Sequence, residues 1–137
     1  MVDADRLARL LDHVRRDVDR LASTGRRPRA DVRGDVLDAV KYRFVTAIEG
    51  CVKAAHHIAA SEGWGAADTN ADAVRLLADH GVLEADLAQR MASAVGFRNV
   101  LVHQYADVRD DLVLARLDDL EDLLDFVGAV AAWLRSV

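Results

Sequence analysis

The chain of 137 residues has the length of a single domain built around one core. Its hydrophobic content of 52% includes only 5% aromatic residues, and the chain has one proline, a composition that favours packed helices over a strand-rich sandwich. No apolar run approaches the roughly 20 residues that a bilayer span requires, and no basic-then-apolar leader opens the sequence. We therefore expect one all-α domain over residues 1–137, with a cytoplasmic location and no membrane contact.

The net charge of −5 argues against indiscriminate nucleic-acid binding, but the charge is distributed unevenly. Residues 1–33 hold nine Arg and six Asp, a local charge of +3, and this region could contact phosphates. Residues 107–125 hold eight acidic residues and two Arg, a local charge of −6, which is typical of a solvated helix face. The single cysteine, Cys51, lies in an apolar helical pattern and is expected to be a small core residue.

Apolar residues recur at three- and four-residue steps in five stretches, which predicts five helices. In chain order these run from about residue 3 to 22, from Asp31 or Asp35 to the break at residues 63–65, from Thr69 or Asn70 to Gly81, onward from Leu83, and from Asp110 or Asp111 to about residue 134. The last helix is expected to bury Leu112, Leu117, Leu120, Leu124, Val127 and Val130. Short connections imply antiparallel neighbours, so the predicted architecture is an up-down bundle of four main helices plus one short helix.

The connection between the first two helices, Gly25-Arg26-Arg27-Pro28-Arg29, is the most positive short segment of the chain. Its Gly and Pro predict a loop. Arg26, Arg27 and Arg29 are candidate phosphate contacts, and an ordinary solvated loop is the competing interpretation.

A polar island, residues 98–105, interrupts the apolar stripe of the fourth helix. Arg98 stands where that stripe would carry a leucine, and a buried guanidinium needs an acidic partner, an oligomer contact or an anionic ligand. His103 follows five residues later, which places it ~140° from Arg98 on a regular helix with ~100° per residue. The two side chains cannot converge on one straight helix. Either the helix is irregular, around Gly96 or after Val102, or a second subunit supplies part of the site.

The string from Gly96 to Tyr105, GFRNVLVHQY, resembles the signature of HEPN-domain proteins, in which an Arg followed by a polar residue precedes a His by five positions. The Tyr two residues after the His is similar to that of the HepT-type toxins, which are partners of a minimal nucleotidyltransferase antitoxin. The resemblance covers about residues 35–115, including Tyr42 and His56-His57-Ile58. The loop after Trp64 departs from the family by lacking a proline.

The resemblance implies metal-free cleavage of RNA, often tRNA, by a site shared across a homodimer. A 2′-hydroxyl that attacks its own phosphodiester needs a proton acceptor near neutral pH, and His103 is the candidate general base and acid. Arg98 is the candidate for stabilising charge on the phosphate oxygens through two parallel hydrogen bonds. Asn99 is the candidate for orienting the phosphate or the His, or else it caps a helix turn. A two-fold axis beside the fourth helix would bring two copies of the motif into one cleft, which the basic loop would extend for RNA phosphates.

In HepT-type toxins the tyrosine that matches Tyr105 is the one to which the antitoxin attaches adenylyl groups. The resemblance therefore implies that AMPylation of Tyr105 inhibits the enzyme, because the added phosphate would compete for Arg98. From its position alone, Tyr105 would continue the stripe of Arg98 and pack in the core with a hydrogen-bonded hydroxyl.

Other interpretations follow from the same residues. No two of the five histidines have the three- or four-residue spacing that puts two metal ligands on one helix face, so neither a metal nor another cofactor is expected. Glu49 and Lys53 are spaced as an ordinary surface pair. The alternative to a ribonuclease toxin is a non-catalytic helical module whose island binds a nucleotide or the antitoxin. A purely structural dimer, with Arg98 paired internally and His103 in solvent, is a third possibility.

Overall fold

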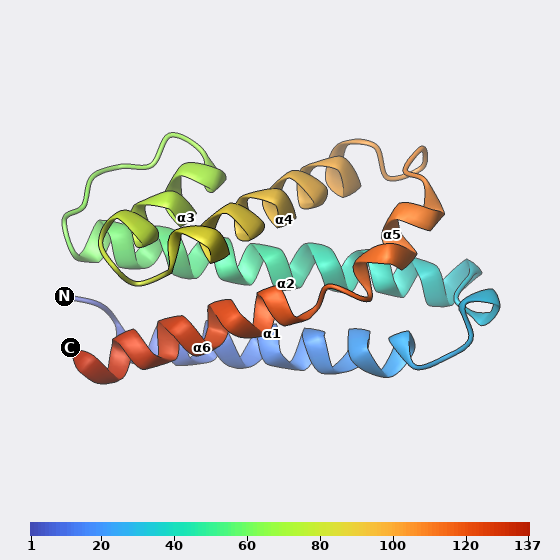
Figure 1. The fold of residues 1–137 in the computed structure, drawn as a ribbon, viewed down its shortest axis with the longest axis horizontal. Coiled ribbons are helices and arrows are strands. Elements are labelled where there is room, and N and C mark those ends of the chain that lie inside the picture. Colours follow the sequence, from blue (N-terminus) through green and yellow to red (C-terminus); the bar gives the residue numbers. More distant parts are fainter.

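The computed structural model describes all 137 residues, which form a bundle of α-helices without any β-strand (Figure 1). The helices are α1 (Ala4–Gly25), α2 (Gly34–Ser61), α3 (Asn70–Asp79), α4 (Ala85–His103), α5 (Asp110–Arg116) and α6 (Glu121–Ser136), with a 3-10 turn, η1 (Arg29–Asp31), before α2. The all-α class and the four main helices, α1, α2, α4 and α6, are confirmed. None of the helices combines the length and the apolar character that a membrane crossing requires.

The four long helices run up and down the bundle, each antiparallel to the previous long helix (Figure 1). Helix α1 packs along α2, and α6 contacts α1, α4 and α2. The connection between α1 and α2 (residues 26–33) and the segment between α4 and α5 (residues 104–109) therefore lie at the same end of the molecule, and both chain termini lie at the other. We call the end that carries residues 26–33 and 104–109 the loop end.

Two helices begin at side chains that satisfy free backbone N–H groups. The carboxylate of Asp3 accepts a hydrogen bond from Arg6 N at 3.0 Å and caps α1. The hydroxyl of Thr69 accepts one from Asp72 N at 3.1 Å and caps α3. Thr69 is thus the correct choice between the two predicted caps of α3.

The start of α2 differs from the prediction. Neither Asp31 nor Asp35 caps it: Asp31 belongs to η1, Asp35 lies inside the first turn of α2, and Arg33 occupies the cap position without a side-chain hydrogen bond. Gly34 has a φ of 56°, a left-handed conformation that glycine adopts without a steric penalty, and it lets the chain turn from η1 into α2. Asp35 still favours the helix, because a carboxylate in the first turn interacts with the positive end of the helix dipole.

The prediction of one unbroken last helix is wrong, because the chain turns between α5 and α6. A continuous helical repeat would bury Leu112 and Leu124, but these side chains are 50% and 44% exposed. The turn resets the helical phase, so that Val113 and Leu123 face the core instead. The bundle therefore has two short helices, α3 and α5, in place of one.

The contact between α1 and α2 contains a buried acid that the apolar pattern did not predict. Asp17 on α1 is 1% exposed, and its carboxylate accepts hydrogen bonds from Arg43 Nη1 at 3.2 Å and from Thr46 Oγ1 at 2.5 Å, both on α2. His13 Nε2 lies 3.3 Å from the same carboxylate. These partners satisfy a charge that would otherwise be costly to bury. Cys51, also on α2, is fully buried as predicted.

Candidate active site

The polar island lies in the second half of α4 and in the turn that follows it, at the loop end. Helix α4 is continuous through Gly96 and ends at His103, and the amide of Gln104 still donates to Val100 O at 2.8 Å. Neither of the two predicted irregularities occurs. Within one chain, Arg98 and His103 therefore lie on different sides of the same helix and share no hydrogen bond.

Arg98 is held on the inner side of α4 by two hydrogen bonds. Its Nη2 donates to Glu49 Oε1 on α2 at 2.7 Å, and its Nη1 donates to Asn99 Oδ1 at 3.0 Å. The side chain is 20% exposed, and Nε is buried without a hydrogen-bond partner. The expected acidic partner exists, but the predicted surface pair of Glu49 with Lys53 is wrong, because the Glu49 carboxylate turns to the guanidinium.

This arrangement gives Arg98 a fixed orientation with donors to spare. A guanidinium has five N–H groups, and only two are used by Glu49 and Asn99. The remaining Nη hydrogens can donate to an anion such as a phosphate. Asn99 itself is exposed, so its amide group can reach both Arg98 and a bound molecule.

His103 differs from the other four histidines in making no side-chain hydrogen bond, ion pair or aromatic stack within the chain. The ring of His13 lies against Asp17, His56 pairs with Asn70, His57 accepts from the amide of Asp3, and His80 stacks on Trp64. The imidazole of His103 is exposed at the end of α4. Both of its ring nitrogens are therefore available to a substrate, and its ring, unlike that of His80, is not held by a stacking contact.

Tyr105 lies beyond the end of α4, so the prediction that it continues the buried stripe of Arg98 is wrong. The side chain is 43% exposed. Its hydroxyl donates to Asp38 Oδ1 on α2 at 3.4 Å, and the Nζ of Lys41 lies 5.0 Å from the ring centroid. Burial, followed by the charge of Asp38, raises the pKa of Tyr105 above its ordinary value.

Three residues of this region on α2, Glu49, Asp38 and Lys41, were not predicted as site residues. Lys41 could have been found by the argument used for Arg98, because it stands on an apolar stripe between Leu37 and Phe44. It is 7% exposed, and its Nζ lies 3.6 Å from Asp110 Oδ1. The sequence carries no comparable signal for Glu49 and Asp38, whose roles depend on which helix packs opposite them.

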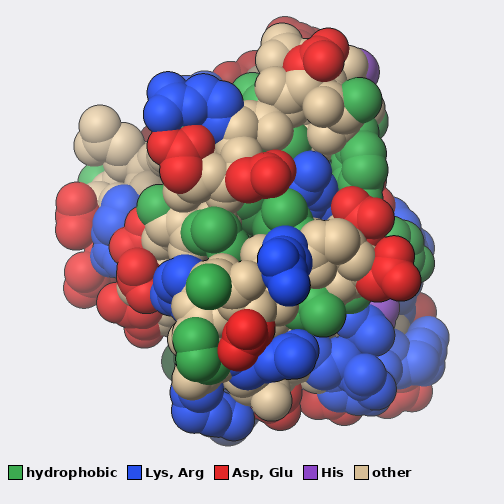
Figure 2. All heavy atoms as spheres, turned by 90° about the vertical axis from the view of Figure 1, so that its right-hand side faces the viewer, with side chains coloured by type: hydrophobic (Ala, Val, Ile, Leu, Met, Phe, Trp, Pro, Cys, Tyr) green, Lys and Arg blue, Asp and Glu red, His purple; other side chains and the backbone are tan.

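The basic connection lies at the same end of the molecule as Tyr105. Figure 2 shows this end, with Lys and Arg side chains gathered on its lower part among scattered carboxylates. Arg29 is committed to the fold, since it donates to Gly25 O at 2.9 Å and to Asp118 Oδ1 at 2.8 Å. Arg26 and Arg27 are exposed and form no ion pair. Of the three predicted phosphate contacts, these two are therefore the ones available to a ligand.

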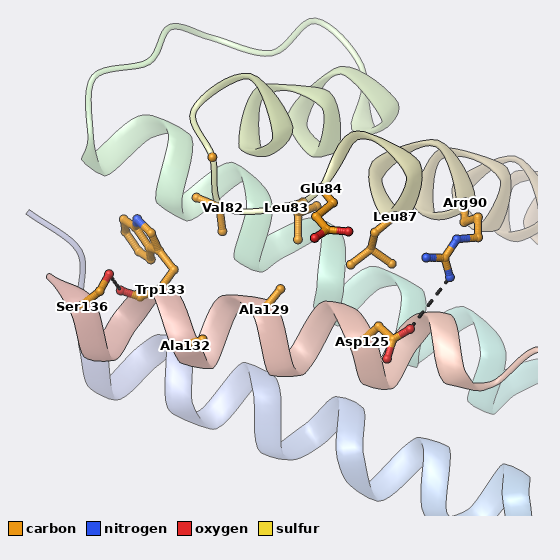
Figure 3. Close-up of a pocket in the computed structure, with 11 residues that line it drawn as sticks. Val82, Leu83, Glu84, Leu87, Arg90, Asp125, Ala129, Ala132, Trp133 and Ser136 are labelled. Atoms are coloured by element: carbon orange, nitrogen blue, oxygen red, sulfur yellow. Dashed lines mark hydrogen bonds and ion pairs between the residues drawn. The ribbon is translucent and has the colours of Figure 1, made fainter.

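A large groove of the surface lies elsewhere. It has a volume of about 700 Å³ and runs between α6 and the first turns of α4 (Figure 3). Apolar side chains such as Leu83, Leu87 and Trp133 line it, with Arg90 and Asp125 paired at one end. None of the predicted site residues borders this groove. The chain also contains no cluster of three or more His, Cys, Asp or Glu side chains placed to bind a metal ion.

Comparisons with known proteins agree with the sequence resemblance. The chain is 28% identical over 96 residues to the mRNA nuclease HepT of Shewanella oneidensis, an alignment that covers 67% of this chain and 72% of the relative. The fold is similar to that of the tri-AMPylated HEPN toxin of Shewanella oneidensis in complex with an MNT antitoxin, with a TM-score of 0.86 at 23% identity, covering 95% of this chain and 99% of that chain. It is also similar to YutE of Bacillus subtilis, a cytosolic protein, with a TM-score of 0.82 at 18% identity, covering 98% and 92% of the two chains.

The family model of the ribonuclease HepT-like proteins matches residues 10–130, which include the whole of α2, α3, α4 and α5. This match contains every residue of the polar island and all three arginines of the basic connection. The chain therefore belongs to the ribonuclease HepT-like family.

Proposed function

We propose that the chain is the ribonuclease toxin of a toxin–antitoxin pair and that it cleaves RNA without a metal ion. The observation that carries the proposal is the difference in surroundings between two side chains of α4. Arg98 is anchored by Glu49 and Asn99, whereas His103 is exposed at the helix end without a partner. One side chain is fixed to receive an anion, and the other is free to exchange a proton.

In the proposed reaction, the 2′-oxygen of a ribose attacks the adjacent phosphorus, and the bond to the leaving 5′-oxygen breaks. His103 accepts the proton of the 2′-hydroxyl and returns a proton to the 5′-oxygen, a task suited to an imidazole, which can both accept and donate a proton. The free Nη hydrogens of Arg98 stabilise the charge that develops on the non-bridging phosphate oxygens. Asn99 orients the guanidinium, to which it is already hydrogen-bonded at 3.0 Å.

The proposed active form is a homodimer with its two-fold axis beside α4. A straight α4 places His103 ~140° around the helix from Arg98, so a second copy must supply one of the two groups to a shared cleft. Val100 on α4 and Leu112 on α5 border a common hollow of the surface and are 38% and 50% exposed. Apolar side chains exposed together are typical of a surface that another protein covers.

The proposed regulation is AMPylation of Tyr105 by a minimal nucleotidyltransferase antitoxin. Support comes from the structurally similar Shewanella toxin, which is tri-AMPylated and bound to its MNT antitoxin. Tyr105 follows the catalytic helix and is 43% exposed, so that an enzyme can reach its hydroxyl. An attached AMP brings a phosphate to the end of α4, where it would compete with RNA for Arg98 and Asn99.

The test is cleavage of total cellular RNA by the purified chain in excess EDTA. We expect products that end in a 2′,3′-cyclic phosphate or its 3′-phosphate hydrolysis product, because the attacking oxygen belongs to the RNA itself. Activity that disappears with EDTA and returns with a divalent ion would contradict the metal-free reaction. Absence of cleavage together with tight binding of the antitoxin would favour the alternative, a non-catalytic partner-binding module.

A further inference from the structure

The hydroxyl of Tyr105 has a single partner, and that partner is a carboxylate. Asp38 Oδ1 lies 3.4 Å from the phenolic oxygen, and both side chains are exposed to solvent on one face. The Nζ of Lys41 lies over the tyrosine ring, 5.0 Å from its centroid. Tyr105 is thus fixed in place with its oxygen accessible.

Lys41 is itself fixed by burial and by a second carboxylate. It is 7% exposed, and its Nζ lies 3.6 Å from Asp110 Oδ1 on α5. A cation over an aromatic face attracts the ring, so Lys41, itself paired with Asp110, favours this position of Tyr105. The charged groups that face this tyrosine are therefore Asp38 and Lys41 from α2 and Asp110 from α5.

A phenol needs help to act as a nucleophile near neutral pH. The ordinary pKa of tyrosine is about 10, so the phenolate is scarce at pH 7. Burial and the nearby Asp38 raise the pKa of Tyr105 further, which makes the phenolate scarcer still. Attack by the neutral hydroxyl requires a base that removes the proton as the new bond forms.

We propose that Asp38 is the general base for nucleotidyl transfer to Tyr105, an inference that rests on the proposed function. The co-reactant is a nucleoside triphosphate held by the partner nucleotidyltransferase. The phenolic oxygen of Tyr105 attacks the α-phosphorus, the bond from that phosphorus to the β-phosphate oxygen breaks, and pyrophosphate leaves. The phenolic proton passes to Asp38 Oδ1 and then to solvent.

The same geometry explains why the modified protein can itself supply the base. Asp38 sits on α2, in the toxin's own frame, and is aligned with the hydroxyl before any partner binds. A distance of 3.4 Å is long for a hydrogen bond, but catalytic hydrogen bonds commonly shorten when the reacting complex forms. The Asp38 carboxylate therefore prepares Tyr105 as an acceptor and distinguishes it from the more exposed Tyr42.

The test measures single-turnover AMP incorporation at Tyr105, with the full chain, MgATP and the cognate nucleotidyltransferase, followed by intact and peptide mass spectrometry between pH 6.5 and 8.5. We expect Asp38→Asn to slow the reaction about 100-fold or more at pH 7. The wild-type rate should vary little with pH. The Asp38→Asn rate should rise about tenfold per pH unit, because only the phenolate then reacts.

Asp35→Asn is the matched control, since Asp35 is an exposed carboxylate one turn earlier on α2 without a contact to Tyr105. It should leave the rate of AMP incorporation unchanged, and Asp38→Glu should restore part of the lost rate. A shift in thermal unfolding cannot produce the altered pH profile.

An Asp38→Asn chain that is modified at Tyr105 as fast as wild type, with the same flat pH profile, would overturn the assignment of the base and leave the proposed regulation intact. A wild-type adduct on another residue, or none at all, would overturn the proposed regulation and this inference with it.

Discussion

At the scale of single residues, some charged and polar side chains are held by contacts within the fold, and others are free of them. Asp17, Arg29 and Lys41 are charged side chains tied into the structure by hydrogen bonds or ion pairs. His103 has no such ties. Substitution of a polar side chain without a structural role has little effect on the free energy of unfolding. A loss of activity in such a variant therefore reports mainly on function.

Replacement of His103 by alanine should abolish catalysis without unfolding the protein. We expect RNA cleavage to fall by about 10²- to 10⁴-fold, the usual contribution of a general acid–base group, and the free energy of unfolding to change by less than about 0.5 kcal/mol. Cleavage assays and thermal denaturation measure the two effects. His57→Ala is the control, because His57 accepts a hydrogen bond from the Asp3 amide at 2.9 Å and lies away from the loop end. Retained cleavage by His103→Ala would exclude it as the base.

Replacement of Glu49 by alanine should affect both stability and activity. The Arg98 guanidinium would lose its carboxylate at 2.7 Å while remaining largely buried. We expect a loss of about 1–2 kcal/mol in the free energy of unfolding, between the values for exposed and for buried ion pairs. RNA cleavage should fall as well, because the guanidinium is no longer held in one orientation. Lys53→Ala, which removes the surface partner predicted from spacing, should change neither. An increase in cleavage by Glu49→Ala would show that Glu49 competes with the phosphate instead of positioning Arg98.

At the scale of secondary-structure elements, the bundle depends on the close contact of α1 with α2. Gly50 on α2 faces α1 at a point where a Cβ atom would lie 2.7 Å from Val14 Cγ2. Thr46, which donates a hydrogen bond to Asp17 on α1, lies four residues before Gly50, so the apolar and polar contacts of the two helices adjoin. A small residue at this position lets the helix backbones approach closely enough for both sets of contacts.

Gly50→Ala should therefore destabilise the protein, although alanine is the better helix former. Overpacking costs about 1–3 kcal/mol, and the gain in helix propensity offsets at most about 1 kcal/mol. The matched control is Gly128→Ala on α6, where nothing lies within 4 Å of the added Cβ and a gain in stability is expected. Chemical denaturation of the two variants gives the comparison. Equal stabilisation by both would mean that Val14 moves aside without cost.

At the scale of the whole molecule, the up-down topology collects the functional candidates at one end. The ends of α1 and α4 and the starts of α2 and α5 meet there, which brings Arg26 and Arg27, Tyr105 and the C-terminal part of α4 to the same side (Figure 1). What the single chain does not do is bring Arg98 and His103 together. Completion of the site by a second copy makes a specific prediction.

Co-expression of an Arg98→Ala chain with a His103→Ala chain should restore RNA cleavage that neither variant shows alone. In the mixed dimer, one subunit contributes an intact Arg98 and the other an intact His103 to the same cleft. Differently tagged chains and a two-step purification isolate the mixed dimer for the assay. The control is a mixed dimer of wild type with the double variant Arg98→Ala/His103→Ala. Each of its shared sites lacks one of the two groups, so it should not cleave RNA. Lack of any restored cleavage would place both groups of each site on one chain.

The sequence by itself determined the fold class, most helix positions and the identity of the polar island. Helical periodicity and caps are local properties, so α1, α3 and α4 and the buried Cys51 follow from residues a few positions apart. The same local argument marked Arg98 as a guanidinium in need of a partner. It failed where the phase of the repeat was interrupted, as at the turn between α5 and α6, because periodicity assumes one continuous helix.

Only the tertiary structure decided which side chains meet. Glu49 is separated from Arg98 by 49 positions, and Asp38 from Tyr105 by 67, so no spacing rule connects them. The spacing rule paired Glu49 with Lys53 because it considers one helix at a time, whereas in the folded chain Glu49 pairs with the largely buried guanidinium of Arg98 on α4. Because α4 ends at His103, Tyr105 does not continue the apolar stripe and instead contacts Asp38 and Lys41 on α2. Contacts between helices depend on how the faces pack, and this is the physical reason why the residues that position the site became visible only in the folded chain.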